Sequence, residues 1–118
     1  MGITKAVLTV KNLKDAKKQL KGEFLVDSGA FYTVLPKRWV EKLGVKPSFE
    51  QEFSLADGSR VKRKIGHAMI EFEGRETPSP VVLGEIKDAA LMGVLTLESL
   101  GLVLNPFDRT LRPAHLML

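Results

Sequence analysis

The segment FLVDSGA, residues 24–30, places an acid directly after a run of core-forming side chains. A carboxylate is among the most costly groups to bury, so Asp27 at the end of an apolar strand requires an explanation. One explanation is chemical, because a carboxyl group held on a rigid, dry support can act as a general acid or base. The other is structural, because Asp and Ser next to Gly also form ordinary turns and helix N-caps.

The composition describes an ordinary globular chain. Its 118 residues, of which 44% are hydrophobic and 27% charged, fit one domain spanning 1–118 and can bury roughly two-thirds of the unfolded surface. The absence of cysteine excludes disulfides, thiolate metal sites and cysteine nucleophiles. No apolar run approaches the ~20 residues of a membrane span. We therefore expect a cytoplasmic protein with no membrane partner.

The net charge of +4 permits nucleic-acid binding, but the arrangement of the basic residues does not favour it. Lysines cluster within residues 11–21 and a second basic group spans 60–64, both without the interleaved aromatic residues that stack on bases. His67 and His115 have no acid or histidine at ligand spacing, and Ser28 has no histidine partner in a nucleophile motif. The sequence thus predicts no nucleic-acid partner, no metal, no other cofactor and no serine hydrolase.

Hydrophobic periodicity predicts strands for most of the chain. A helix is expected over 36–44, where Pro36 and Gly44 bracket apolar residues at helical spacing, and a second over 95–101. Asp57-Gly58 is a strong hairpin-turn signal between two extended segments. A polar connection is expected over 12–22, ending at Gly22. The predicted strands are 3–10, 23–27, 34–35, 49–56, 60–72, 81–84, 90–94, 102–104 and 107–112.

The two halves of the chain repeat a pattern of strand, glycine and helix. FLVDSG is followed by a short apolar strand and a helix that ends in LG at 43–44. ALMG at 90–93 is followed by a helix that ends in LG at 100–101. The second half has Met92-Gly93 where the first has Ser28-Gly29, and it carries no acid there. The chain therefore supplies one such acid, not two.

These motifs resemble those of the retropepsin-like aspartic proteases. The resemblance is carried by DSGA in an apolar strand followed by TVLP, by the central hairpin and by the second glycine motif, and it runs from about residue 4 to residue 112. It implies an all-β, closed-barrel-like acid protease fold with one or two short helices, in which the hairpin is the flap. Because one chain supplies one aspartate in such a motif, the resemblance also implies a homodimer in which two Asp27 side chains face each other across a two-fold axis.

The resemblance also assigns roles to individual residues. Asp27 would be catalytic, Ser28 would buttress the two identical loops against one another, and Gly29 would let the backbone approach closely. The expected substrate-binding residues are Ala30, Phe31, Tyr32, Ala56, Asp57, Gly58 and Ser59. Phe31 and Tyr32 stand where viral members commonly carry an acid, so the adjacent subsites should be apolar.

The expected function is that of a homodimeric aspartic endopeptidase acting on extended peptides, with one Asp27 activating water and the other polarising the peptide carbonyl. The alternative is a non-catalytic, dimeric peptide-binding or adaptor module with the same fold. Residues 3–8 and the C-terminal stretch are the candidates for the dimer contact. Pro113 is unsuited to a central strand, so the pairing of the termini stays open.

Overall fold

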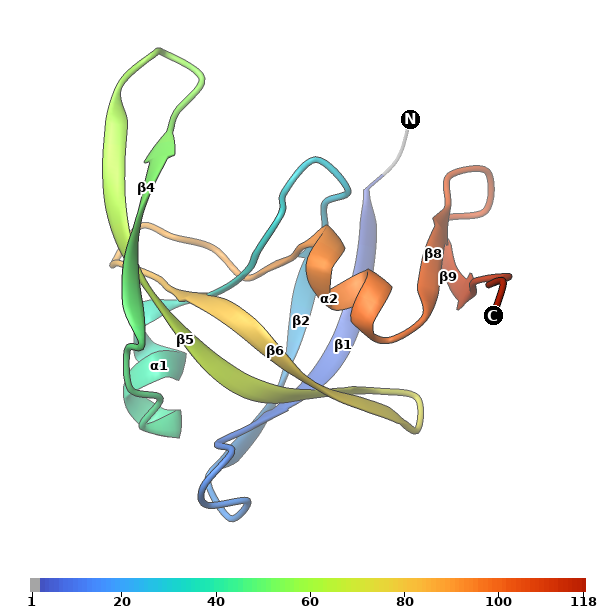
Figure 1. Ribbon diagram of the computed structural model, residues 1–118, viewed down its shortest axis with the longest axis horizontal. Helices are drawn as coiled ribbons and strands as arrows, with labels where there is room; N and C mark the ends of the chain where they lie inside the picture. The colour runs from blue at the N-terminus through green and yellow to red at the C-terminus, as the bar shows by residue number, and fades with distance from the viewer. Residues whose placement is uncertain (1–2) are drawn as a thin grey trace.

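The structure, a computed structural model, describes residues 3–118. Within these residues the chain forms nine strands and two short helices (Figure 1). The strands are β1 (Thr4–Lys11), β2 (Gln19–Val26), β3 (Thr33–Leu35), β4 (Phe49–Ser54), β5 (Arg60–Phe72), β6 (Arg75–Leu83), β7 (Leu91–Met92), β8 (Leu102–Asn105) and β9 (Thr110–Pro113). The helices are α1 (Lys37–Leu43) and α2 (Val94–Ser99). Within the described part of the chain, no helix is long and apolar enough to cross a membrane.

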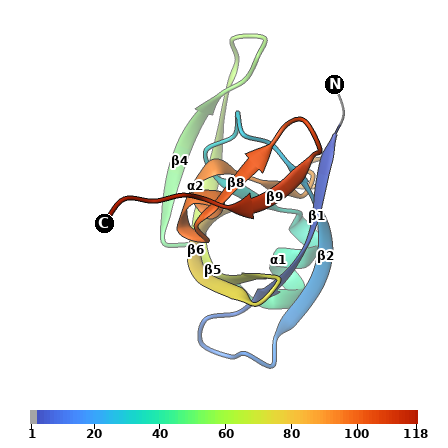
Figure 2. The same cartoon turned by 90° about the vertical axis from the view of Figure 1, so that its right-hand side faces the viewer.

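Seven strands form one sheet in the order β1-β2-β7-β3-β6-β5-β4. β1 also pairs with β5, from Thr9 opposite Glu71 to Lys11 opposite Met69. This pairing closes six of the seven strands, all except β4, into a ring. β4 lies outside this ring and extends with the start of β5 as a hairpin (Figure 1). β8 and β9 form a separate two-stranded sheet at the other side of the molecule (Figures 1 and 2). The prediction of an all-β fold with short helices is confirmed.

The core fills the inside of the ring because side chains alternate across each strand. On β1, Thr4, Ala6, Leu8 and Val10 are buried, whereas the alternating Lys5 and Val7 are exposed. The partner strand β2 contributes its apolar end to the same cluster, which also includes residues of both helices. The apolar run that precedes Asp27 is therefore a core strand, which gives the acid a rigid support.

Helix α1 has the ends that its sequence predicts. Pro36 precedes the helix, and Gly44 ends it in the left-handed conformation, with φ of 67°. The Asn12 side chain donates hydrogen bonds to the carbonyls of Leu43 and Gly44, at 2.8 and 3.3 Å. These bonds satisfy carbonyls that the helix end leaves unpaired. Asn12 thereby fixes the β1–β2 connection to α1.

The predicted end of the polar connection at Gly22 is wrong. β2 begins at Gln19, and Gly22 lies inside it, opposite Leu8 of β1. The glycine serves packing here, because a Cβ at this position would lie 2.5 Å from Cη2 of Trp39. The ring of Trp39 thus occupies the space that a side chain at position 22 would need.

Strand β6 begins six residues before the predicted strand at 81, at Arg75. The intervening segment contains Pro78 and Pro80, which lack an N–H donor and oppose Met69 and His67 of β5. β3 pairs with β6 only from Val81 to Leu83, so the prolines lie where β6 has a strand on one side alone. A strand with a partner on one side alone can accommodate prolines, because their nitrogens can face the side that has no partner strand.

We expect Gly22→Val to lower the free energy of unfolding by about 1–3 kcal/mol, because the new side chain must displace the ring of Trp39 from the core. Urea denaturation measures this loss. The control is the same substitution in a Trp39→Leu background, where the space is open and the loss should be smaller. Equal losses in the two backgrounds would show that Trp39 does not set the requirement for glycine.

Candidate active site

Asp27 follows the last residue of β2 and is held by its own loop and by β7. Its backbone N–H donates to the carbonyl of Met92 at 3.0 Å, and its carbonyl accepts the N–H of Ala30 at 3.1 Å. Its carboxylate Oδ1 accepts the N–H of Gly29 at 2.9 Å. The side chain is half-buried, so the acid stands at the exposed end of a core strand and keeps contact with water. This placement explains how the chain carries an acid after FLV.

The second glycine motif lies directly against the Asp27 loop. The N–H groups of Val94 and Leu95 donate to the carbonyls of Ala30 and Phe31, at 2.8 and 3.0 Å. A Cβ at Gly93 would lie 2.4 Å from the carbonyl oxygen of Tyr32, so position 93 admits no side chain. The two glycine motifs that the sequence presents as repeats are thus packed together within one chain.

A buried set of three hydroxyl groups, which the sequence analysis did not identify, joins these motifs. Thr33 Oγ1 accepts the N–H of Gly93 at 3.0 Å and lies 2.5 Å from Thr96 Oγ1. Ser79 Oγ of β6 lies 2.8 Å from the same Thr96 oxygen. All three side chains are fully buried. The feature of the sequence that could have indicated this set is the threonine of TVLP, a polar residue at the first position of an apolar strand.

A cleft of about 530 Å³ lies between the Asp27 loop and the β4–β5 hairpin. Six of the ten predicted site residues line it: Asp27, Gly29, Ala30, Phe31, Tyr32 and Ala56. The remaining lining residues are mostly apolar, and they include Phe53 and Leu55 of the hairpin and Leu91 of β7. The hairpin therefore forms one wall of the cleft that contains Asp27, which is the position expected of a flap.

The other four predicted residues lie apart from the lining of the cleft. Ser28 is exposed, so its role between two identical loops stays a prediction. Asp57, Gly58 and Ser59 form the turn of the hairpin, where Gly58 has a φ of 88°. Asp57 Oδ1 accepts hydrogen bonds from the hydroxyl and the N–H of Ser59, at 2.6 and 2.8 Å, and these bonds lower the pKa of Asp57. The carboxylate of Asp57 thus stabilises the turn itself.

Aromatic rings connect the Asp27 loop to the hairpin. Phe31 and Tyr32 meet edge to face with ring centres 4.9 Å apart, and Tyr32 meets Phe53 of β4 in the same way at 6.0 Å. Such contacts stabilise beyond the area that they bury. Phe31 remains more than half exposed beside the cleft. These rings give the cleft an apolar wall next to Asp27.

An ion pair that the sequence analysis missed forms part of the same cleft. Arg63 of β5 and Asp88 of the β6–β7 connection both line it, with Arg63 Nε 2.7 Å from Asp88 Oδ2. The guanidinium of Arg63 holds the pKa of Asp88 below its usual range, and Asp88 raises that of Arg63. The residues are 25 positions apart and follow no motif, so the sequence offered no spacing signal.

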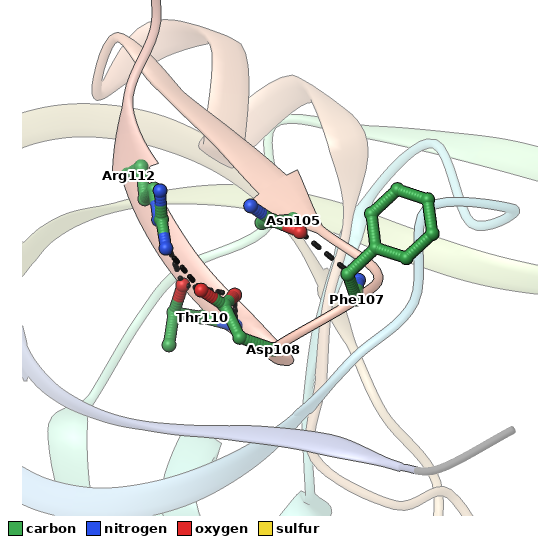
Figure 3. A network of polar contacts seen from close by, with 5 residues as sticks. All are labelled: Asn105, Phe107, Asp108, Thr110 and Arg112. Carbon is green, nitrogen blue, oxygen red and sulfur yellow. Dashed lines mark hydrogen bonds and ion pairs between the residues drawn. The ribbon is translucent and has the colours of Figure 1, made fainter.

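The β8–β9 hairpin carries the C-terminal part of the chain to the end of the molecule where the Asp27 loop and the start of β1 also lie (Figures 1 and 2). Its turn is held by Asn105, which accepts the N–H of Phe107 at 2.9 Å, and by Asp108, which pairs with Arg112 (Figure 3). Asp108 also accepts the Thr110 hydroxyl at 2.6 Å. β8 is thus paired with β9 within its own chain, and the pairing of the termini between subunits stays open.

A ring of strands that presents an aspartate loop against a second glycine motif, beneath a hairpin, defines an acid protease fold of the retropepsin type. A sequence model of the family described as aspartyl protease matches residues 11–102, so the chain belongs to that family. EIAV protease, solved in complex with the inhibitor HBY-793, is similar in structure, with a TM-score of 0.61 and 17% identity. The match covers 99% of this chain and 94% of that one. No curated protein matches the sequence.

We expect Thr33→Val to lower the free energy of unfolding by about 1–3 kcal/mol, because it keeps the shape of the side chain but leaves the buried N–H of Gly93 without its acceptor. Thermal or urea denaturation measures the loss. Thr77→Val is the matched control, since the Thr77 hydroxyl bonds only to the carbonyl of the adjacent Pro78, at 3.1 Å in an exposed position. Equal losses in the two variants would show that the buried hydroxyl set contributes no more to the free energy of unfolding than an exposed hydroxyl does.

Proposed function

We propose that this chain is a homodimeric aspartic endopeptidase that cleaves extended peptides with two Asp27 side chains, one from each subunit. The observation that carries the proposal is the position of Asp27. Its carboxylate lies in the lining of the cleft, oriented by the N–H of Gly29, on a loop that β7 holds in place. Membership of the aspartyl protease family supports the same conclusion.

The chemistry requires the two carboxyl groups to share one proton. Two carboxylates in close contact cannot both be ionised, so one stays protonated while the other carries the charge. The charged group takes a proton from the attacking water, and the neutral group donates a hydrogen bond to the peptide carbonyl as negative charge develops on its oxygen. The single chain supplies half of this arrangement.

The substrate in this proposal is a peptide in extended conformation, bound between the Asp27 loop and the β4–β5 hairpin. Ala30, Phe31 and Tyr32 would contact it from below, and Ala56 from the hairpin. Because the walls beside Asp27 are largely apolar, the adjacent subsites would favour apolar side chains over charged ones. Asp57 would act on the substrate indirectly, through the shape of the turn.

Asp27→Asn tests the shared mechanism. The variant should fold and dimerise at least as well as the wild type, because it removes a like-charge contact, and it should have no peptidase activity. When wild type and variant are mixed and equilibrated at fixed total protein, activity on a cleaved library peptide should follow the square of the wild-type fraction. Subunit exchange is confirmed by native mass spectrometry.

A linear dependence on the wild-type fraction would contradict a dyad shared between subunits. A wild-type protein that binds library peptides without cutting them between pH 3 and 7 would instead indicate the peptide-binding or adaptor module.

The dimer contact in this proposal includes the β8–β9 turn. Phe107 at this turn is 96% exposed, and its ring points away from the polar network of the hairpin (Figure 3). Ile3, at the start of the described chain, is also exposed. The β8–β9 turn and the start of β1 lie at the end of the molecule that carries the Asp27 loop (Figures 1 and 2). A second copy placed to complete the Asp27 pair would therefore cover apolar surface on the same face.

We expect Phe107→Asp to raise the dimer dissociation constant at least about tenfold, as for an exposed aromatic side chain that becomes buried at an interface. Analytical ultracentrifugation measures the constant. Leu13→Asp is the control, because Leu13 is also exposed but belongs to the β1–β2 connection at the opposite end of the molecule (Figure 1). A Phe107→Asp protein that dimerises like the wild type would remove this turn from the interface without affecting the Asp27 mechanism.

A further inference from the structure

The residues of the β4–β5 hairpin that line the cleft are apolar apart from Ser54 and one charged residue, Arg63. Phe53, Leu55 and Val61 line the cleft, and Arg63 lies among them. The positions of β5 that alternate with Val61 and Arg63 are exposed, whereas these two are half-buried. A guanidinium that faces an apolar cleft loses hydration, which costs free energy unless a partner compensates the charge.

Asp88 supplies that partner with two hydrogen bonds. Arg63 Nε donates to Asp88 Oδ2 at 2.7 Å, and Arg63 Nη2 donates to Oδ1 at 3.3 Å. The side chains are only 21% and 25% exposed. Two-pronged contacts between a guanidinium and a carboxylate fix orientation as well as distance. The pair thus resists both sliding and rotation of β5 against the β6–β7 connection.

The carboxylate of Asp88 is itself held in place. Its Oδ2 also accepts the N–H of Glu85 at 2.7 Å, and the N–H of Asp88 donates to the carbonyl of Glu85 at 2.9 Å. The connection that carries Asp88 leads directly into β7, whose Met92 carbonyl accepts the N–H of Asp27. Arg63 is therefore attached to the part of the chain that also positions Asp27.

We propose that Arg63 and Asp88 are positioning residues that hold the β4–β5 hairpin over the cleft beside Asp27. The hairpin has a second attachment, the edge-to-face contact of Phe53 with Tyr32. Within the described residues β4 pairs with β5 alone, and these two side-chain contacts join the inner face of the hairpin to the walls of the cleft. Without the ion pair, the hairpin keeps the contact of Phe53 with Tyr32 and the pairing of β5 with β6 at its base, which begins at Lys64.

The consequence for catalysis rests on the proposed function. Phe53, Leu55 and Ala56 can contact a peptide only when the hairpin lies over the cleft. A hairpin that leaves this position for part of the time binds substrate less tightly, because the competent conformation is a smaller fraction of the population. The chemistry at Asp27 is unchanged once the peptide is enclosed, so the loss falls on KM.

Arg63→Gln, Asp88→Asn and the double variant test the proposal. With a library peptide that the wild type cleaves, each should raise KM about tenfold while kcat stays within about threefold. The double variant should resemble the single variants, because all three lack the same contact. Hydrogen–deuterium exchange should become faster over residues 49–65 and stay unchanged over β1 and β2. Urea denaturation of each variant measures any general loss of stability.

The pair Arg60–Glu52 provides the matched control. It joins β4 to β5 on the outward face of the hairpin. Arg60 Nη1 lies 3.4 Å from Glu52 Oε1, and the side chains are 71% and 49% exposed. An exposed pair of this kind contributes little. Arg60→Gln and Glu52→Gln should leave KM and the exchange of residues 49–65 as in the wild type, although they change the net charge of the protein as Arg63→Gln and Asp88→Asn do.

The outcomes separate this inference from the proposed function. Unchanged exchange over residues 49–65 in Arg63→Gln and Asp88→Asn would overturn the positioning role, whatever the activity. Lower stability with unchanged KM would also overturn it and leave a structural ion pair. If the wild type cleaves no peptide, the proposed function fails, and the exchange measurement still decides whether Arg63 and Asp88 hold the hairpin.

Discussion

The close approach of Gly93 to the backbone of residues 31–32 is the contact on which the site depends. Because position 93 has no side chain, β7 can enter between β2 and β3 and accept the N–H of Asp27. The hydroxyl of Thr33 then completes the contact from within the core. Backbone groups thus hold Asp27 on both sides, because the carbonyl of Met92 accepts its N–H and the N–H of Gly29 donates to its carboxylate.

The sequence predicts the parts of this fold that depend on local chemistry. The apolar run before Asp27, the helix between Pro36 and Gly44 and the Asp57-Gly58 turn each follow from residue types at fixed spacing. The comparison of the two glycine motifs identified a repeat, and the structure shows that its two copies pack together. These features are determined by neighbours within a few positions, which is why a single sequence suffices to find them.

The features that the sequence did not predict depend on contacts between distant segments. The sequence around Gly22 predicts a strand boundary, whereas in the structure the glycine makes room for the ring of Trp39. Thr33, Thr96 and Ser79 are unremarkable in sequence and form a network only when three elements meet. Arg63 belongs to a basic strand whose other charges face water, and its pairing with Asp88 depends on the path of the β6–β7 connection. The roles of these residues are therefore determined by contacts in the folded chain and not by the residues next to them in the sequence.

The pairing of β8 with β9 bears on how an assembly of this chain would arise. Within the described residues each of these two strands has a partner on one side, so each keeps an outer edge whose backbone donors and acceptors are available to another chain. In the proposed homodimer a strand of the second subunit can pair at such an edge, while each chain keeps its own pairing of β8 with β9. Assembly of this kind is a reversible equilibrium between folded species, so the fraction of complete sites would rise and fall with protein concentration.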